Sequence, residues 1–428
     1  MGRERPYDVA VVGGGASGLA AALSAARSGA SVLVIERDVE AGLPILATGN
    51  GRCNLSNARL DPERYRHPEV ARAVMGERPE EELSAFFDSL GLLTCEEDGR
   101  LYPYSRRADS VRDALLMSAA PAADLACCAD LRRAAFDPSA GAWDLVLAEP
   151  AGPLPRPGRR ALDFRGMLRH RRRELARAPR RERAVRARRV VIACGGSSSA
   201  TASLFGLPHI DETPVLCPVA CVPELDAGAL EQLDGLRVEG SLALVRGGRP
   251  IWSEPGEVLF RPFGLSGIVA FDLSRRVRAG DTVELDLFPA LGEHALAELF
   301  EARSHVVGSP ERMGAAWFTG LLAGALGAHV AAAAERSGDG CAPAALAHLC
   351  KHLPFLARGT ADERSAQVSR GGIPFDAVDL PRLGIRADLA PGLLACGEAL
   401  DMDADCGGFN LAWAWLSGLR AGAEAAGA

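Results

Sequence analysis

The sequence predicts an α/β protein in which a discontinuous Rossmann-like domain is interrupted by a β-rich, barrel-like domain and a small helical domain. Three observations predict this fold class. A glycine-rich turn at residues 13–18 follows the first apolar run of the chain. Short alternating runs separated by Gly and Pro fill residues 213–286, and Ala- and Leu-rich helical patterns fill 295–352. A strand-like run and a closing helix after residue 365 return the chain to the first domain.

The composition is that of an ordinary globular protein of 428 residues, with 48% apolar residues, 24% charged residues and a net charge of −7. It excludes collagen-like, wholly disordered and disulfide-scaffold proteins. No apolar run approaches the roughly 20 residues that cross a bilayer, and no signal-peptide core precedes the first strand. We therefore expect a cytoplasmic protein with no membrane partner and with reduced cysteines. No Cys/His spacing matches a zinc site, so we expect no metal.

The first forty residues predict a dinucleotide site. A strand at Tyr7–Val12 leads into the glycine turn, a helix at Leu19–Ser28 follows, and a second strand at Ser31–Ile35 ends on Glu36. A lone glycine motif is weak evidence, but here all the parts of a βαβ nucleotide-binding unit occur in order. The alternative is a glycine-rich turn in an unrelated α/β unit.

Each glycine of the GxGxxG spacing has its own role. Gly13 permits the tight turn, Gly15 lets a pyrophosphate approach the backbone, and Gly18 lets the helix pack on the strand. The pyrophosphate would lie at the helix N-terminus, where free N–H groups favour negative charge. Glu36 can accept hydrogen bonds from a ribose, which favours FAD or NAD over NADP.

Later segments favour FAD. A strand at Arg188–Ala193 ends in a Cys-Gly-Gly turn, and another at Gly392–Cys396 ends in Gly397-Glu398. Three aspartates and Gly407–Asn410 then precede a closing helix that runs from Leu411 to about Ala425. The positive end of that helix suits the anionic N1–C2=O edge of a reduced flavin. The alternative is an ordinary helix entry.

Candidates for chemistry lie in the segment 49–57. Gly49 and Gly51 allow the backbone close to a flavin, and Arg52 can place a positive charge near a substrate. Asn54 and Asn57 can donate to flavin carbonyls. The expected catalytic residues are Arg52, Cys53 as a redox thiol and Tyr104 as a proton donor, with ordinary packing as the alternative for the last two. The residues expected to contact FAD are Gly13, Gly15, Ala16, Ser17, Gly18, Glu36, Arg37, Gly49, Gly51, Arg52, Asn54, Cys194, Gly195, Gly397, Glu398, Asp401, Gly408, Asn410 and Leu411.

An arginine-rich insertion at about 150–186 is unusual. Between Arg156 and Arg189 there are fifteen arginines and three acidic residues, which gives a local charge of 15 − 3 = +12. Such a segment is either a patch for a polyanion or a solvated, partly helical arm. Aromatic interleaving is absent apart from Phe164, so stacking on bases is not supported and we expect no nucleic-acid partner.

Six segments, taken in order, resemble one family of bacterial NAD(P)/FAD-dependent oxidoreductases, the group that includes dehydro-bile-acid reductase-like and aminoacetone oxidase-like flavoproteins. The segments are Gly42–Asn57, Gly99–Ser105, Ala193–Ser197, Gly256–Gly267, Val368–Pro374 and Gly397–Gly418. The resemblance implies non-covalent FAD and an FAD domain with two insertions. The expected boundaries are 1–200 and 365–428 for the FAD domain, 205–290 for the β-rich domain with 353–368 as a candidate completing segment, and 291–352 for the helical domain.

The resemblance implies an FAD-dependent oxidoreductase that moves a hydride between flavin and a small organic substrate. The expected reaction is NAD(P)H-dependent reduction of a C=C or keto group, with a bile-acid or steroid-like molecule as one candidate substrate. No second GxGxxG follows a strand, so a nicotinamide donor would act transiently at the flavin itself. The alternatives are an O₂-using oxidase of a small amine and a non-catalytic flavin-binding module with a basic arm. The oligomeric state is left open.

Overall fold

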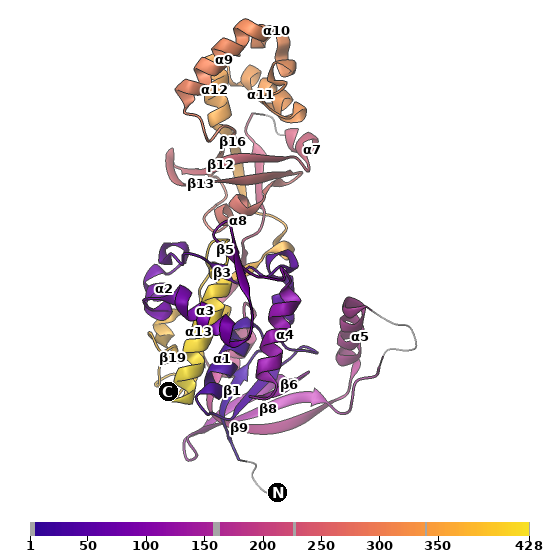
Figure 1. Cartoon of the computed structure of the whole chain (residues 1–428), viewed down its shortest axis with the longest axis vertical. Coiled ribbons are helices and arrows are strands. Elements are labelled where there is room, and N and C mark those ends of the chain that lie inside the picture. Colours follow the sequence, from indigo (N-terminus) through magenta and orange to yellow (C-terminus); the bar gives the residue numbers. More distant parts are fainter. Residues whose placement is uncertain (1–4, 157–162, 226–227, 339, 428) are drawn as a thin grey trace. The chain divides into compact units, whose positions relative to one another are not determined.

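The computed structural model describes residues 5–156, 163–225, 228–338 and 340–427. The chain forms two compact units (Figure 1): a first unit of Met1–Thr213 with Val368–Ala428, and a second unit of Pro214–Gln367. The two connecting segments, β10 (Ile210–Val215) and β17 (Val368–Gly372), pair with each other. Because of this pairing, residues 205–213 belong to the first unit. The expected start of the β-rich domain at residue 205 is therefore too early.

The first unit is built on a nine-stranded sheet. Its parallel part has the order β20 (Leu393–Ala395), β9 (Arg180–Ile192), β1 (Tyr7–Val12), β2 (Val32–Glu36) and β6 (Asp124–Cys127). The central strand β1 reads as a continuous apolar run because both faces of a parallel sheet are covered. The carboxyl ends of these strands lie along one edge of the sheet, where α/β proteins bind ligands.

Helix α1 (Ala16–Arg27) begins three residues before the expected start, because Gly15 serves as its N-cap. The last helix, α13 (Phe409–Ala426), packs directly on α1. A Cβ on Gly418 would lie 2.4 Å from Ser17 O, and a Cβ on Gly422 would lie 2.2 Å from Ala21 O. The two glycines therefore set how closely the C-terminal helix approaches the nucleotide-binding helix.

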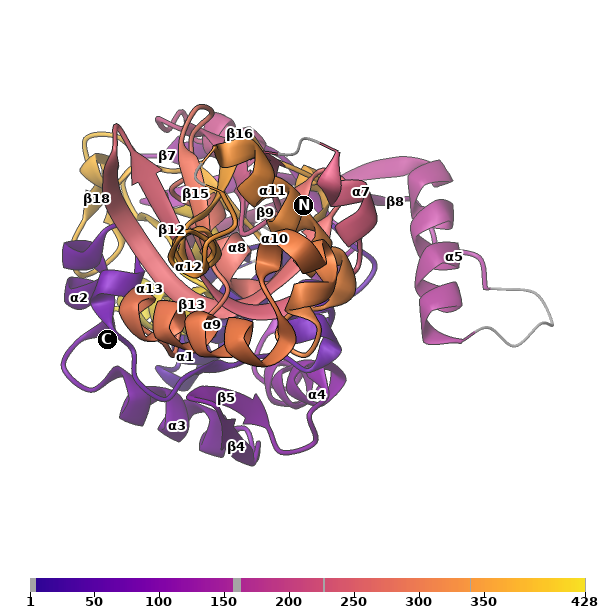
Figure 2. The ribbon, with the colours of Figure 1, turned by 90° about the horizontal axis from the view of Figure 1, so that it is seen from above.

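The arginine-rich segment contains a strand and a helix. Strand β9 starts at Arg180, earlier than the expected Arg188, because β8 (Ala142–Pro150) pairs antiparallel with its first half. Helix α5 (Phe164–Arg177) stands to one side of the sheet (Figure 2). It is held by ion pairs from Arg171 to Glu40 and from Arg172 to Asp38, both at 2.5 Å. Residues 157–162 of the expected insertion lie outside the described residues.

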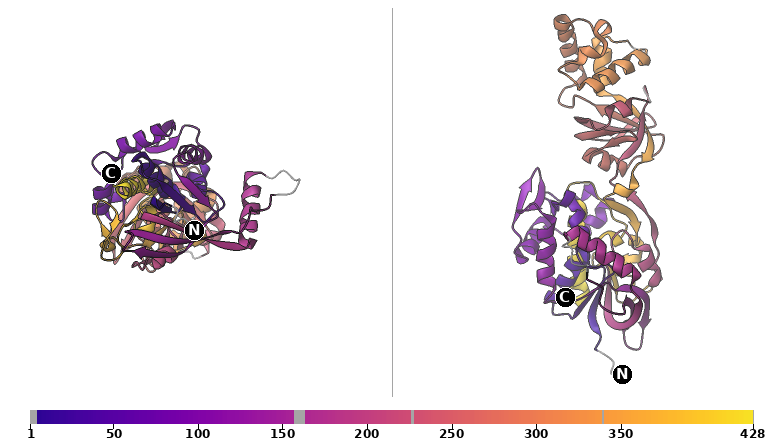
Figure 3. Two further views of the ribbon diagram at one scale, coloured as in Figure 1. Left: turned by 90° about the horizontal axis from the view of Figure 1, so that it is seen from below. Right: turned by 90° about the vertical axis from the view of Figure 1, so that its right-hand side faces the viewer.

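The second unit is a closed six-stranded barrel with helices attached (Figure 3). The strands follow the order β11 (Val219–Pro223), β14 (Gly264–Ser266), β13 (Arg249–Arg261), β12 (Arg237–Arg246), β15 (Thr282–Asp286) and β16 (Leu353–Thr360). Helices α9 (Glu293–Val307), α10 (Pro310–Met313), α11 (Gly324–Ser337) and α12 (Pro343–Lys351) share one apolar core with the barrel. The predicted fold class is confirmed.

Shorter elements complete the two units. In the first unit they are η1 (Leu43–Gly51), β3 (Ser56–Asn57), η2 (Pro62–Arg64), α2 (Pro68–Met75), α3 (Pro79–Ser89), β4 (Thr94–Glu97), β5 (Arg100–Pro103), α4 (Ala108–Ala119), β7 (Asp130–Asp137), α6 (Ser199–Leu204), η5 (Phe375–Ala377), β18 (Val378–Asp379), β19 (Gly384–Ile385) and η6 (Gly397–Ala399). In the second unit they are α7 (Ala229–Leu233), α8 (Ile268–Ser274), η3 (Gly314–Phe318) and η4 (Glu363–Ser365). Over the described residues, no helix combines the length and apolar character needed to cross a membrane.

Candidate flavin site

The glycine turn after β1 leaves open space where a pyrophosphate is expected. Gly13 has a φ of +110°, and a Cβ there would lie 2.4 Å from Ala193 O. A Cβ on Gly18 would lie 1.9 Å from Gly13 O, so helix and strand meet at this residue. A Cβ on Gly15 would meet no described atom within 4 Å. The N-terminus of α1, formed by Ala16 and Ser17, has no side-chain cap among the described residues, so its N–H groups fit an anion.

Glu36 at the end of β2 lies beside this turn. Its Oε2 accepts a hydrogen bond from Gly14 N at 2.7 Å, and its Oε1 accepts one from Asp38 N at 2.7 Å. Two backbone donors therefore hold the carboxylate against the glycine turn, in the place where a nucleotide ribose is bound in this class of fold. Arg37, the next residue, is exposed.

The ends of β9 and β20 meet the same turn. Cys194 and Gly195 follow β9, and the Cys194 Cα would lie 2.9 Å from a Cβ on Gly13. Gly397 follows β20 with a φ of +66°, and a Cβ there would lie 2.4 Å from Ser17 Oγ. Trp413 Nε1 of α13 donates to Gly397 O at 3.0 Å. The structure thus brings the expected residues of four separate segments together.

Glu398 places a carboxyl group at this edge of the sheet. Its Oε1 accepts a hydrogen bond from Ser369 N at 2.6 Å. A Cβ on Gly196 would lie 2.5 Å from the same oxygen, so only glycine fits beside it. Burial, together with the nearby charges of Asp403 and Glu212, raises the pKa of Glu398 to about 7. This pKa shift could not be predicted from the sequence, because it depends on which residues cover the side chain.

The segment 54–57 lies against the N-terminus of α13, although the two are some 350 positions apart. Asn57 Nδ2 donates to Gly407 O at 3.1 Å. With its amide turned so that donors face acceptors, Asn54 donates to Ser56 O at 2.8 Å and accepts from Gly408 N at 3.0 Å. Both amides are therefore engaged within the protein. Asn54, expected to donate to the flavin, instead positions the loop in front of α13.

The N-terminus of α13 remains available to an anion. Its N-cap is Gly408, with a φ of +99°, and no described side chain caps it. The Asn410 side chain faces back into the preceding loop, where it accepts from Ala404 N at 2.9 Å and donates to Ala404 O at 2.8 Å. The groups that could meet a ligand are therefore the backbone N–H groups of the first turn, including those of Asn410 and Leu411.

The structure argues against direct contact between Asp401 and a cofactor. This side chain is 3% exposed. Its Oδ1 accepts from Gly371 N at 3.0 Å, and its Oδ2 lies 3.4 Å from both His67 Nε2 and Arg66 Nη2. Burial opposes ionisation, but the His67 hydrogen bond and the Arg66 charge lower the pKa of Asp401 below its ordinary value. Its carboxylate is used to anchor the loop that leads to α13.

Arg52 and Tyr104 lie on exposed parts of the first unit. Arg52 Nη2 donates to Glu97 Oε2 at 2.8 Å, and its guanidinium lies 4.5 Å from the centre of the Tyr102 ring. The turn before it uses left-handed backbone at Gly49 and Gly51, with φ of +54° and +84°. The Tyr104 side chain is 67% exposed. Either side chain is accessible to a substrate that approaches from solvent.

Cys53 does not fit the expected redox role. The residue is fully buried, and burial raises the pKa of its thiol to about 11. Because the thiolate is the reactive form, a thiol in this environment is inert at neutral pH. Every cysteine among the described residues is free.

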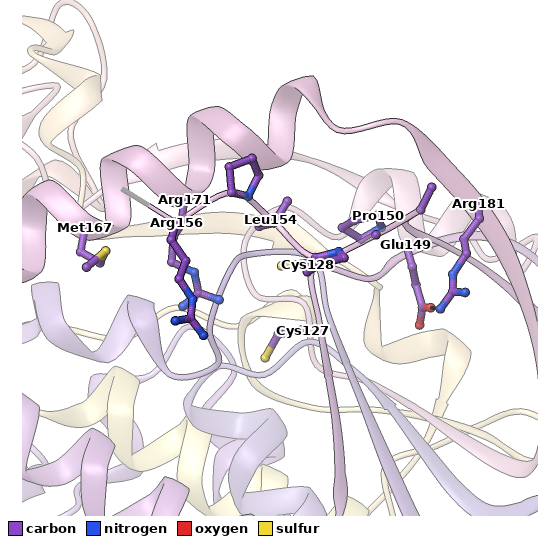
Figure 4. A pocket seen from close by; sticks show the side chains of 13 residues that line it. Cys127, Cys128, Glu149, Pro150, Leu154, Arg156, Met167, Arg171 and Arg181 are labelled. Atoms are coloured by element: carbon purple, nitrogen blue, oxygen red, sulfur yellow. Dashed lines mark ion pairs between the residues drawn. The ribbon is translucent and has the colours of Figure 1, made fainter. Parts of the chain in front are cut away.

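A hollow in the first unit lies away from these residues (Figure 4). It measures about 980 Å³ and lies between the arginine-rich arm and the end of β6, with Cys127, Cys128, Leu154, Met167 and Arg171 among its lining residues. None of the residues expected to bind FAD lines it. It therefore adds nothing to the flavin site.

The residues present fit FAD. Open space at Gly15, a held carboxylate at Glu36 and a second uncapped helix N-terminus at Gly408 match the pyrophosphate, the ribose and the anionic ring edge. A discontinuous Rossmann-like domain of this kind, joined to a barrel and helices, defines the class of FAD-dependent oxidoreductases, and the chain is one of them.

The chain belongs to the HI0933-like family. Residues 7–126 match the model of the HI0933-like protein Rossmann domain, and residues 213–368 match that of the HI0933-like protein barrel and H2TH domain. A 3-dehydro-bile acid delta(4,6)-reductase from Clostridium scindens is 30% identical over 98% of both chains. Ribosomal RNA dihydrouridine synthases from Haemophilus influenzae and Escherichia coli are 22% and 23% identical, over 95% and 96% of both chains. These findings confirm the predicted family.

Proposed function

We propose that this protein uses FAD to reduce a carbon–carbon double bond that is conjugated to a carbonyl, with NAD(P)H as the electron donor. The observation that carries the proposal is the likeness, over 98% of the chain, to a relative named as a delta(4,6)-reductase of a 3-dehydro bile acid. The other relatives are named for making dihydrouridine, which is uridine reduced at a double bond conjugated to a carbonyl. The two names describe one kind of reaction on unlike molecules, so reaction type is better supported than substrate.

In this proposal the chain's own residues bind and orient. The N-terminus of α1 at Gly15 holds the pyrophosphate, and Glu36 holds ribose hydroxyls. The backbone N–H groups at the start of α13 stabilise negative charge on the ring edge. FAD, when bound, supplies the hydride chemistry. Saturating an activated double bond also requires a proton, and exposed Tyr104 is the candidate donor, with Arg52 to orient a polar or anionic substrate.

Anaerobic mixing of the purified holoenzyme with NADH or NADPH tests the donor. The proposal expects rapid bleaching of the flavin, followed by recovery of its colour when a conjugated steroid-like enone is added without oxygen. If NAD(P)H leaves the flavin oxidised while a small amine bleaches it and O₂ restores it, the protein is an oxidase. If neither bleaches it, the protein is a flavin-binding module and the proposal is wrong.

A second candidate substrate, uracil within an RNA, is favoured by one feature of the arm. Arg165, Arg169, Arg173 and Arg177 recur every four residues along α5, and all four are exposed. Within the described ranges, none of them has a carboxylate partner. Residues four apart lie on one helix face, so they form a positive stripe of the kind that binds phosphates.

Charge reversal of two stripe residues, Arg169→Glu with Arg173→Glu, separates the two candidates. An RNA reductase should lose dihydrouridine formation in ribosomal RNA while its flavin is still reduced by NAD(P)H at the normal rate. A small-molecule reductase should be unaffected. The expectation of no nucleic-acid partner stays a prediction that this experiment decides. The cytoplasm is the compartment we propose, since NAD(P)H and ribosomal RNA are available there.

A further inference from the structure

The geometry points to a binding site for a divalent transition-metal ion, with Zn²⁺ as the first choice, formed by His348, His352 and Glu293 in the second unit. One ligand atom from each of the three side chains lies within 4.8 Å of the others. None of the three residues is among those expected to bind FAD, and the inference is independent of the proposed function. The expectation of no metal depended on Cys/His spacing along the chain, and it stays a prediction that the experiment below tests.

Two elements supply the ligands. His348 lies in the last turn of α12 and His352 is the C-cap of the same helix, so the two rings lie on one helix face with centres 4.9 Å apart. Glu293 is the first residue of α9, which packs against α12. An imidazole pair four apart on a helix, with one carboxylate from a neighbouring element, is a ligand set that Zn²⁺ uses in proteins.

The distances suit one ion. His348 Nδ1 lies 3.0 Å from Glu293 Oε1, and His352 Nε2 lies 3.6 Å from Glu293 Oε2. Ligands about 2.1 Å from a tetrahedral zinc ion are about 3.4 Å from one another, by simple geometry from usual zinc bond lengths. These two separations, one to each oxygen of Glu293, are on either side of that value, and one ligand atom from each residue lies within 4.8 Å of the others, so the side chains would have to move to enclose an ion.

A fourth residue fixes the orientation of His352. Its Nδ1 lies 2.8 Å from Glu284 Oε2 on β15, and its other ring nitrogen, Nε2, lies 3.6 Å from Glu293 Oε2. Where Nδ1 donates to Glu284, Nε2 is the ring atom available to an ion. A carboxylate behind a histidine ligand is the usual arrangement that orients such a ligand.

The nearby basic side chain does not compete for this space. Lys351 Nζ lies 2.6 Å from Asp286 Oδ2 and donates to the carbonyl oxygens of Phe288 and Leu291. An ion held by Glu293 and the two histidines would join the start of α9 to the end of α12. We therefore expect it to stabilise the helical part of the second unit. Three protein ligands leave the remaining positions to water.

Titration of the metal-free holoenzyme with Zn²⁺ by calorimetry, and with Co²⁺ by visible absorption, tests the site. The wild type should bind one ion saturably at micromolar concentration, with cobalt bands typical of four-coordination and a raised unfolding temperature. His348→Ala and His352→Ala should each weaken binding by at least about tenfold, and Glu284→Gln by about tenfold through lost orientation. The rate of flavin reduction should stay unchanged in all of them.

His305→Ala is the matched control. His305 is exposed on α9, and its Nε2 lies 3.7 Å from Glu301 Oε1, one helical turn away. Among the described residues it is not part of a group of three potential ligands. Its replacement should leave metal affinity and the unfolding temperature unchanged. Failure of the wild type to bind Zn²⁺ or Co²⁺ would overturn the inference. So would binding that survives replacement of both His348 and His352, because the ion would then lie elsewhere.

Discussion

Asn57 Nδ2 donates a hydrogen bond to Gly407 O at 3.1 Å across 350 positions of sequence. This bond joins the segment after the first βαβ unit to the loop that opens the last helix. A Cβ on the next glycine, Gly408, would lie only 2.3 Å from Ser56 O, so the contact depends on the absence of a side chain there. The position of the α13 N-terminus therefore depends on residues from the beginning of the chain.

Replacing Asn57 by Ala should disturb this position. Loss of one hydrogen bond should lower the free energy of unfolding by about 1 kcal/mol. If the start of α13 stabilises the reduced flavin by up to about 2 kcal/mol, the midpoint potential should fall by at most roughly 40 mV. Spectroelectrochemistry of the holoenzyme measures it. Exposed Arg59→Ala is the control, and equal potentials in all three proteins would contradict a role for this helix end.

Gly15→Val should release FAD without unfolding the protein. Gly15 has a φ of −80°, and a Cβ there meets no described atom within 4 Å. The valine methyl groups therefore fill the space expected for the pyrophosphate without straining the backbone. We expect FAD affinity to fall at least about 100-fold, since a pyrophosphate binds only by close approach to the backbone. Absorbance at 450 nm per protein measures flavin content. Gly152→Val, also in open space, should keep full flavin content. A Gly15→Val protein that retains its flavin would refute the role of Gly15 in binding the pyrophosphate.

Glu398 should make stability depend on pH. Its pKa is raised from 4.5 to about 7, so the native protein binds more protons than the unfolded chain between these values. The stabilisation from this carboxyl is fully present below pH 4.5 and is lost as the pH rises through 7. The free energy of unfolding should fall by at most about 3 kcal/mol, at 1.36 kcal/mol per pKa unit. Glu398→Gln should flatten this decline in urea unfolding at pH 5, 6 and 7.5. Exposed Glu69→Gln should retain the wild-type slope, and an unchanged slope in Glu398→Gln would exclude this carboxyl as the cause.

Cys53→Ala should leave the flavin chemistry intact. The thiol is fully buried with a pKa of about 11, so it is protonated at neutral pH and has no redox partner among the described residues. We expect the rate of flavin reduction by NAD(P)H to change less than about twofold, with a stability loss of about 1 kcal/mol from the small cavity. Stopped-flow absorbance measures the rate. A large loss of rate with full flavin would restore the redox hypothesis.

The βαβ unit could be predicted because its signals are local. Strand β1 has the predicted bounds, and the glycine spacing, the helix and Glu36 follow within 36 residues, so backbone sterics and helix-end charge act between near neighbours. The functions expected for Cys53, Asp401 and Asn54 could not be settled in this way. Each depends on burial or on partners such as Arg66, which lies more than 300 positions from Asp401.

The sequence by itself determined the fold class, the nucleotide-binding turn and the family, because these depend on residue type at short, fixed spacing. Only the tertiary structure decided which polar groups remain available to bind a ligand and which are used within the protein. It paired Asn57 with Gly407, placed Glu398 where burial raises its pKa, and brought Glu293 to His348 and His352. The physical reason is that desolvation and hydrogen bonding depend on distance in space, which residue spacing does not specify for segments that meet only after folding.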